Sequence, residues 1–122
     1  MTLQELYQNI GGSYDQAIRI MRVEKLMDKH IRRFPASGVV DAVLAAGEKM
    51  DGQALFEAAH AMKGVCGNLG LQELADLASA ITEEFRPGHP RSMTDEEVRE
   101  ILDRIDAGNR RALQGIADYT EA

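Results

Sequence analysis

Apolar residues recur at intervals of three and four along almost the whole chain, and this spacing constrains the fold more than any other feature. In the C-terminal segment, for example, Ile101, Leu102 and Ile105 are followed by Leu113 and Ile116. Such a period places apolar side chains on one face of an α-helix, whereas a half-buried strand needs alternation at every second residue. Aromatic residues, which favour strands, make up only 5% of the sequence. We therefore expect an all-α fold.

Glycine, proline and capping residues divide this pattern into separate helices. Thr2 and Glu5 have the spacing of a capping box, as do Thr94 and Glu97, so each pair predicts a helix start. Pro35 ends another helical segment. Short connections favour antiparallel neighbours, and the predicted architecture is an antiparallel four-helix bundle with additional short N-terminal helices. The expected helical segments are 3–10, 17–34 with Leu26 and Met27 facing inward, 39–50, 53–69, 71–86 and 94–118.

The length of 122 residues suits one compact domain, which we expect to span 1–122. No apolar run reaches the roughly 18 residues of a membrane span, and the N-terminal residues lack the basic and apolar blocks of a secretion signal. These features predict a cytoplasmic protein without a membrane segment. The single cysteine, Cys66, excludes an internal disulfide and a CxxC metal clip.

Charge is distributed unevenly along the chain. The net charge of −6 argues against nucleic-acid binding, which usually requires a basic surplus. Ten acidic and four basic residues lie between Glu73 and Asp106, whereas six basic and two acidic residues lie between Gln16 and Arg33. A solvated helix face with local ion pairs is the simpler explanation of such a basic segment, and an acidic partner is the alternative.

The expected helix over residues 53–69 has an unusual polar face. At about 100° per residue, its apolar side chains form a stripe between about 140° and 260° from His60. His60 therefore points away from the core. Within about 60° of His60 lie Phe56, Glu57, Lys63, Gly64 and Gly67.

The neighbours of His60 are not those of an ordinary solvated face. Glycine in a helix interior costs about 1 kcal/mol relative to alanine, so Gly64 and Gly67 leave bare backbone at the cost of helix stability. Phe56 would place an aromatic ring in water unless a partner covers it. Lys63 would attract an anion. These features predict that His60 is a nucleophile that accepts a phosphoryl group, with Lys63 stabilising the transferred charge.

The same residues disfavour two other kinds of chemistry. Acyl transfer is disfavoured because no serine or cysteine shares the face of His60, and Cys66 points into the core. A metal site is disfavoured because His60 has no second histidine or cysteine three or four residues away, and because Lys63 would repel the ion. The alternative function is a helical adaptor that binds proteins through the Phe56 and Gly64 face without being phosphorylated.

The segment from Ala59 to Gly70 resembles the motif of histidine-containing phosphotransfer (HPt) domains. In that motif, lysine and glycine follow the histidine at three and four residues, and further glycines follow at seven and ten. The matching residues here are His60, Lys63, Gly64, Gly67 and Gly70. The resemblance implies that His60 accepts a phosphoryl group from a receiver-domain aspartate in a two-component phosphorelay and passes it to another receiver.

The resemblance also implies the partners and the accessory residues. The chain would be a monomeric phosphoryl carrier without kinase activity, acting with response-regulator receiver domains, a hybrid histidine kinase, or both. It would hold no cofactor of its own, and Mg²⁺ would belong to the receiver. Phe56, Gly64 and Gly67 would contact the partner, and the basic segment would help to dock it if that segment lies at the same end as His60.

Members of this family often carry Glu or Gln about twenty-two residues after the histidine, where it orients the imidazole through a hydrogen bond. The sequence has Thr82 at that position. The resemblance therefore implies that Thr82, or Glu83 beside it, orients the ring of His60.

Overall fold

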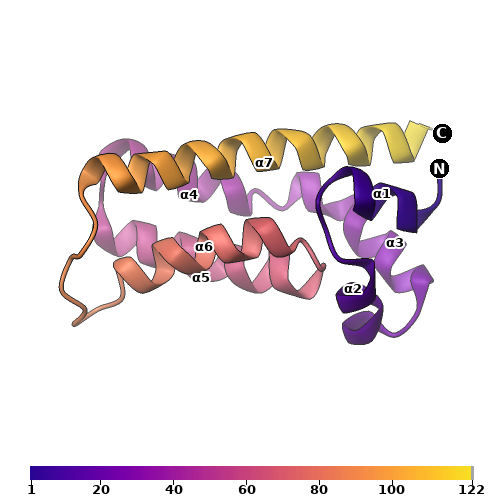
Figure 1. Ribbon diagram of the computed structural model, residues 1–122, viewed down its shortest axis with the longest axis horizontal. Coiled ribbons are helices and arrows are strands. Elements are labelled where there is room, and N and C mark those ends of the chain that lie inside the picture. The colour runs from indigo at the N-terminus through magenta and orange to yellow at the C-terminus, as the bar shows by residue number, and fades with distance from the viewer. Residues whose placement is uncertain (122) are drawn as a thin grey trace.

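The computed structural model describes residues 1–121, which form seven α-helices and one short 3-10 helix (Figure 1). No strand occurs within this described part of the chain. In chain order the elements are α1 (Leu3–Asn9), α2 (Tyr14–Met21), α3 (Glu24–Arg33), the 3-10 helix η1 (Phe34–Ala36), α4 (Val39–Lys49), α5 (Gly52–Asn68), α6 (Gln72–Glu84) and α7 (Asp95–Glu121).

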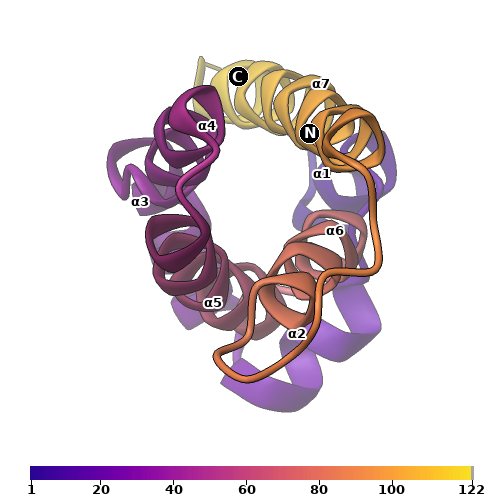
Figure 2. The ribbon, with the colours of Figure 1, turned by 90° about the vertical axis from the view of Figure 1, so that its left-hand side faces the viewer.

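Helices α4, α5, α6 and α7 form an antiparallel bundle. Figure 2 shows the four helices arranged around a common axis, in which α5 packs against α4 and α6, and α7 packs against the same two helices. Helices α1, α2 and α3 lie together at the end of the bundle that holds the C-terminus of α7 (Figure 1). The predicted all-α bundle with short N-terminal helices is therefore confirmed.

Local capping signals set several helix ends as the sequence predicts. At α1 the Thr2 hydroxyl accepts a hydrogen bond from the backbone N–H of Glu5 at 3.1 Å, and the Glu5 carboxylate accepts one from Thr2 at 3.0 Å. Thr94 and Glu97 form the same reciprocal pair before α7. Such boxes satisfy backbone donors that the first helical turn leaves free.

Gly70 joins the end of α5 to the N-terminal helices. Its φ of +73° lies in the left-handed region, and an added Cβ would lie 2.6 Å from the Ser13 carbonyl oxygen. The close approach allows the Ser13 N–H to donate to the Gly70 carbonyl at 2.7 Å. The Tyr7 hydroxyl also donates to the Leu69 carbonyl, at 2.6 Å. These contacts fix the short helices against the C-terminal end of the helix that carries His60.

The expectation of one helix over 17–34 is wrong. The chain forms α2 and α3 instead, separated at Arg22, whose φ is +76°, and at Val23, which is extended. Because α3 restarts in a new rotational phase, Leu26 does not face inward and is 41% exposed, whereas Met27 is buried.

The Glu84 carboxylate anchors the loop between α6 and α7. It is 3% exposed and accepts hydrogen bonds from the Met93 and Ser92 N–H groups, the Ser92 hydroxyl and the Arg91 guanidinium, at 2.8 to 3.0 Å. Burial raises the pKa of this carboxyl, but the hydrogen bonds from Met93, Ser92 and Arg91 outweigh burial and lower the pKa to about 2.

This lowered pKa predicts an acid-dependent loss of stability. The pKa of Glu84 in the folded protein lies below the ordinary glutamate value of 4.5, so its contribution to stability is complete above about pH 5 and is lost as the pH falls towards 2. A shift of this size corresponds to roughly 3 kcal/mol. We expect Glu84→Gln to lower the free energy of unfolding at pH 7 by about 2 kcal/mol and to flatten its pH dependence between pH 5 and 2. Urea unfolding of both proteins between pH 7 and pH 2 measures this difference. Free energies of unfolding that fall in parallel with pH in the two proteins would contradict the role of Glu84.

Candidate functional site

Helix α5 presents His60 on the side opposite to its buried stripe. Asp51 caps the helix, because its carboxylate accepts a hydrogen bond from the Ala54 N–H at 3.2 Å. His60 is exposed. The core side of the helix consists of Leu55, Ala59, Met62 and Cys66, each with 0% exposure.

The backbone beside His60 is open to solvent. A Cβ added at Gly64 or at Gly67 would meet no atom within 4 Å. Neither glycine is therefore required for packing within the described chain, and each leaves unfilled space on the helix surface. A large partner can approach His60 over this surface without displacing a side chain.

Two side chains of α5 flank the imidazole. The Phe56 ring is half-buried and stacks with the His60 ring, with 5.9 Å between ring centroids and 23° between ring planes. Lys63 is half-buried on the same face. Residues three or four apart on a helix are surface neighbours, which brings both side chains beside the imidazole.

The end of α6 adds a charged pair to this face. Glu83 accepts two hydrogen bonds from the Arg86 guanidinium, at 2.8 and 3.1 Å. The guanidinium carbon also lies 5.4 Å from the centroid of the Phe56 ring. The hydrogen bonds from Arg86 lower the pKa of the Glu83 carboxyl, and the positive charges of Arg86 and Lys63 lower it further.

The two residues predicted to orient the imidazole are engaged elsewhere. Thr82 is fully buried, and its hydroxyl donates to the Ala78 carbonyl at 2.8 Å. Glu83 is exposed and paired with Arg86. Within residues 1–121 no hydrogen bond joins either side chain to His60, so no contact supports the prediction that Thr82 or Glu83 orients the ring directly.

Comparison with known proteins assigns the family. A family model described as the Hpt domain matches residues 3–108. The chain belongs to the Hpt domain family. Comparisons with curated proteins and with solved structures found no match. The matched range runs from α1 into α7 and includes the whole face around His60.

Membership of the Hpt family supports a histidine phosphotransfer role in two-component phosphorelays. Hpt domains are phosphocarrier modules that interact with receiver domains and histidine kinases. None of the helices in the described chain is long and apolar enough to cross a membrane.

The only thiol of this Hpt domain is remote from the exposed face. Cys66 has 0% exposure, and burial raises the pKa of its thiol to about 12. A thiol with such a pKa is almost entirely protonated near neutral pH and is a poor nucleophile. Within the described residues, no three His, Cys, Asp or Glu side chains are grouped so that they could hold a metal ion.

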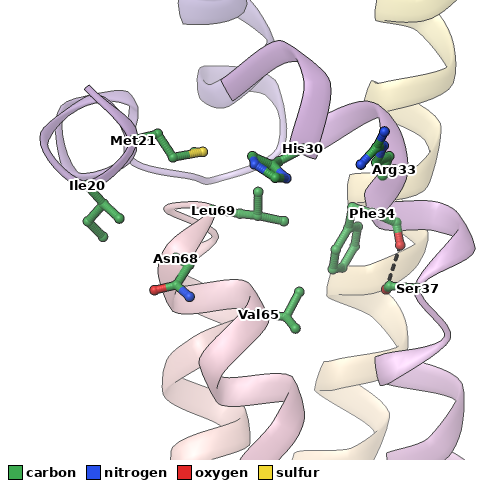
Figure 3. A pocket seen from close by; sticks show the side chains of 9 residues that line it. All are labelled: Ile20, Met21, His30, Arg33, Phe34, Ser37, Val65, Asn68 and Leu69. Carbon is green, nitrogen blue, oxygen red and sulfur yellow. Dashed lines mark hydrogen bonds between the residues drawn. The ribbon is translucent and has the colours of Figure 1, made fainter. Parts of the chain in front are cut away.

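An open groove lies at the C-terminal end of α5 in this Hpt domain (Figure 3). Its volume is about 460 Å³, and the last turns of α5 form one wall while α2, α3 and η1 form the other. Asn68 in this wall lies about 12 Å along the helix axis from His60 and about 80° around it. The lining residues are Ile20, Met21, His30, Arg33, Phe34, Ser37, Val65, Asn68 and Leu69.

Helices α2 and α3 of the basic segment, which line part of this groove, also carry exposed apolar side chains. Ile20, Val23 and Leu26 are 51%, 50% and 41% exposed. The sequence did not reveal this patch, because the single expected helix placed Leu26 in the core. The exposed basic side chains of the same helices and their connection are Arg19, Arg22, Lys25, Lys29, Arg32 and Arg33.

Proposed function

We propose that His60 accepts a phosphoryl group from the aspartyl phosphate of a receiver domain and transfers it to the aspartate of a second receiver. One observation carries this proposal: an exposed imidazole stands on a capped helix beside two glycines with open space above them. A transfer between two proteins requires both reacting groups to reach the same point, and bulky side chains around His60 would prevent that approach.

The chemical step moves phosphorus from oxygen to nitrogen. The lone pair of one imidazole nitrogen forms the N–P bond, while the P–O bond to the aspartate breaks and its electron pair stays on the carboxylate. The proton on the other ring nitrogen remains there, so the phosphorylated ring carries the positive charge that balances the transfer. The reverse sequence on a second receiver regenerates the neutral imidazole.

We assign Lys63 the role of stabilising the phosphoryl oxygens. Its ammonium is on the face of His60 and is a mobile point charge that can follow the phosphoryl group. Negative charge on the three oxygens during transfer is stabilised by a nearby cation. The Mg²⁺ that assists the reaction belongs, in this proposal, to the receiver.

Replacing Lys63 tests this role. We expect Lys63→Gln to slow phosphoryl transfer about tenfold. This effect is smaller than that of removing a buried hydrogen-bond donor from an oxyanion hole, because Lys63 is partly solvated. Lys63→Arg should retain most of the rate since it keeps the charge. Single-turnover transfer from a phosphorylated receiver provides the measurement, with Lys49→Gln at the end of α4 as the matched control. Equal rates for Lys63→Gln and the control would exclude the role.

The basic and apolar surface formed by α2, α3 and their connection is proposed to dock the receiver. Receiver sites gather acidic residues, and the net positive segment of α2 and α3 complements that charge. The exposed Ile20, Val23 and Leu26 supply apolar contact area beside it. In this arrangement the domain is a monomeric carrier and contributes no kinase activity.

A two-step labelling experiment separates a carrier from an adaptor. A ³²P-labelled receiver is mixed with the domain, and a second, unlabelled receiver is added afterwards. The proposal predicts an acid-labile, base-stable label on the domain that disappears when the second receiver becomes labelled. A stable complex that never labels the domain would support the adaptor and refute the proposal.

A further inference from the structure

We propose that stacking orients the imidazole of His60: the Phe56 ring packs on the imidazole, and the Arg86 guanidinium packs on Phe56. This inference rests on the proposed function of His60 and concerns how the same site is prepared for transfer. It assigns Arg86 and Glu83, which lie outside α5 and make no hydrogen bond to His60 within residues 1–121, as positioning residues.

The ring geometry is that of an attractive aromatic pair. A centroid separation of 5.9 Å with planes 23° apart corresponds to offset stacking, which contributes beyond the burial of apolar area. Phe56 is one helical turn before His60, so the backbone of α5 holds the two rings in register. The contact restricts rotation of the imidazole while leaving both ring nitrogens without a hydrogen-bond partner in the described chain.

Arg86 extends the stack to the end of α6. Its guanidinium carbon lies 5.4 Å from the Phe56 centroid, within the range of a cation–π contact. Two hydrogen bonds to the Glu83 carboxylate hold the guanidinium plane in place. Glu83 therefore influences His60 through Arg86 and Phe56 instead of through a direct hydrogen bond.

The loop that follows α6 supports this arrangement. The His89 N–H donates to the Arg86 carbonyl at 2.9 Å, which closes a turn next to Arg86. Further along, Ser92 and Met93 are bonded to the buried Glu84 carboxylate. Arg86 is thus placed between the end of a helix and an anchored loop, so its backbone position is well defined.

A contact with the partner is the competing explanation for Phe56, and a small phosphodonor distinguishes the two. Phosphoramidate can phosphorylate an accessible histidine without docking a protein. If Phe56 orients His60, its loss slows phosphorylation by phosphoramidate as well as by a receiver. If Phe56 only contacts the receiver, its loss weakens receiver binding and leaves the reaction with phosphoramidate unchanged.

The decisive variant removes the ring while keeping an apolar side chain. We expect Phe56→Leu to lower the phosphoramidate rate about three- to tenfold, and Phe56→Tyr to remain within about twofold of the unsubstituted protein. Arg86→Ala should lower the rate about threefold. Arg110→Ala is the matched control, because Arg110 is also exposed and pairs with an acidic residue, Asp106, in α7. Unchanged phosphoramidate rates for Phe56→Leu would overturn the proposal.

NMR of the His60 ring gives a readout that does not depend on phosphoryl transfer. The stack predicts cross-relaxation between the ring protons of Phe56 and His60, and a change in the His60 ring-proton shifts in Phe56→Leu and in Arg86→Ala but not in Arg110→Ala. Identical His60 shifts in all of these proteins would overturn the stack. A domain that shows the NMR contact but accepts no phosphoryl group from receivers would contradict the proposed function alone.

Discussion

His60→Gln is expected to abolish phosphoryl uptake from a phosphorylated receiver. Glutamine has a similar polarity but no nitrogen lone pair able to form the N–P bond, so the loss should be complete within detection. The fold should remain intact because His60 is exposed and the core stripe of α5 lies on the opposite side. Acid-labile, base-stable label per mole of protein, together with helical circular dichroism, checks both statements.

His89→Gln is the matched control for that experiment. His89 is also exposed, and it lies in the loop after α6 rather than on α5. We expect it to take up label at close to the rate of the unsubstituted protein. Label that persists on His60→Gln would place the acceptor on another residue.

Gly64→Gln is expected to slow transfer by at least about a hundredfold while stabilising the helix. A side chain at position 64 would lie one turn after His60 and occupy the open space over which the receiver must approach. A misplacement of about 1 Å in a bimolecular transfer can cost this much. Glycine is the weaker helix former by about 1 kcal/mol, and an added Cβ at Gly64 meets nothing within 4 Å, so the melting temperature should rise.

Two further variants make the Gly64 result specific. Gly64→Ala should show an intermediate loss of rate, because its side chain is one methyl group. Ala107→Gln introduces the same side chain at an exposed position of α7 and should leave transfer unchanged. Transfer by Gly64→Gln at the unsubstituted rate would show that the glycine does not provide access.

Helix positions could be predicted where the signal is local. The capping boxes at Thr2 and Thr94 fix helix starts through contacts three residues apart, and the sequence contains all the atoms involved. The break between α2 and α3 has no such signal. Arg22 adopts a left-handed φ of +76°, a conformation for which arginine has no intrinsic preference. This conformation is set by the packing of α2 and α3 across the end of the bundle. That packing is a tertiary property, which local sequence signals do not encode.

In the candidate site, too, the features set within one helix could be predicted, whereas the contacts between helices could not. The face of His60 follows from the 100° rotation per residue of one helix, so the stripe, the glycines and Phe56 could be placed in advance. Contacts between α5 and α6 depend on how one helix is rotated against the other. Thr82 is turned into the core, and Arg86, which lies past the end of α6, reaches the ring of Phe56 instead.

In the proposed function, the exposed imidazole of His60 carries the phosphoryl group. Mass spectrometry of the domain after incubation with a phosphorylated receiver, under conditions that preserve phosphohistidine, tests it most directly. We predict one added phosphoryl group, located on His60. A phosphoryl group on any other residue would contradict the role of His60. An unmodified domain, in a mixture where the receiver keeps its phosphoryl group, would contradict it as well.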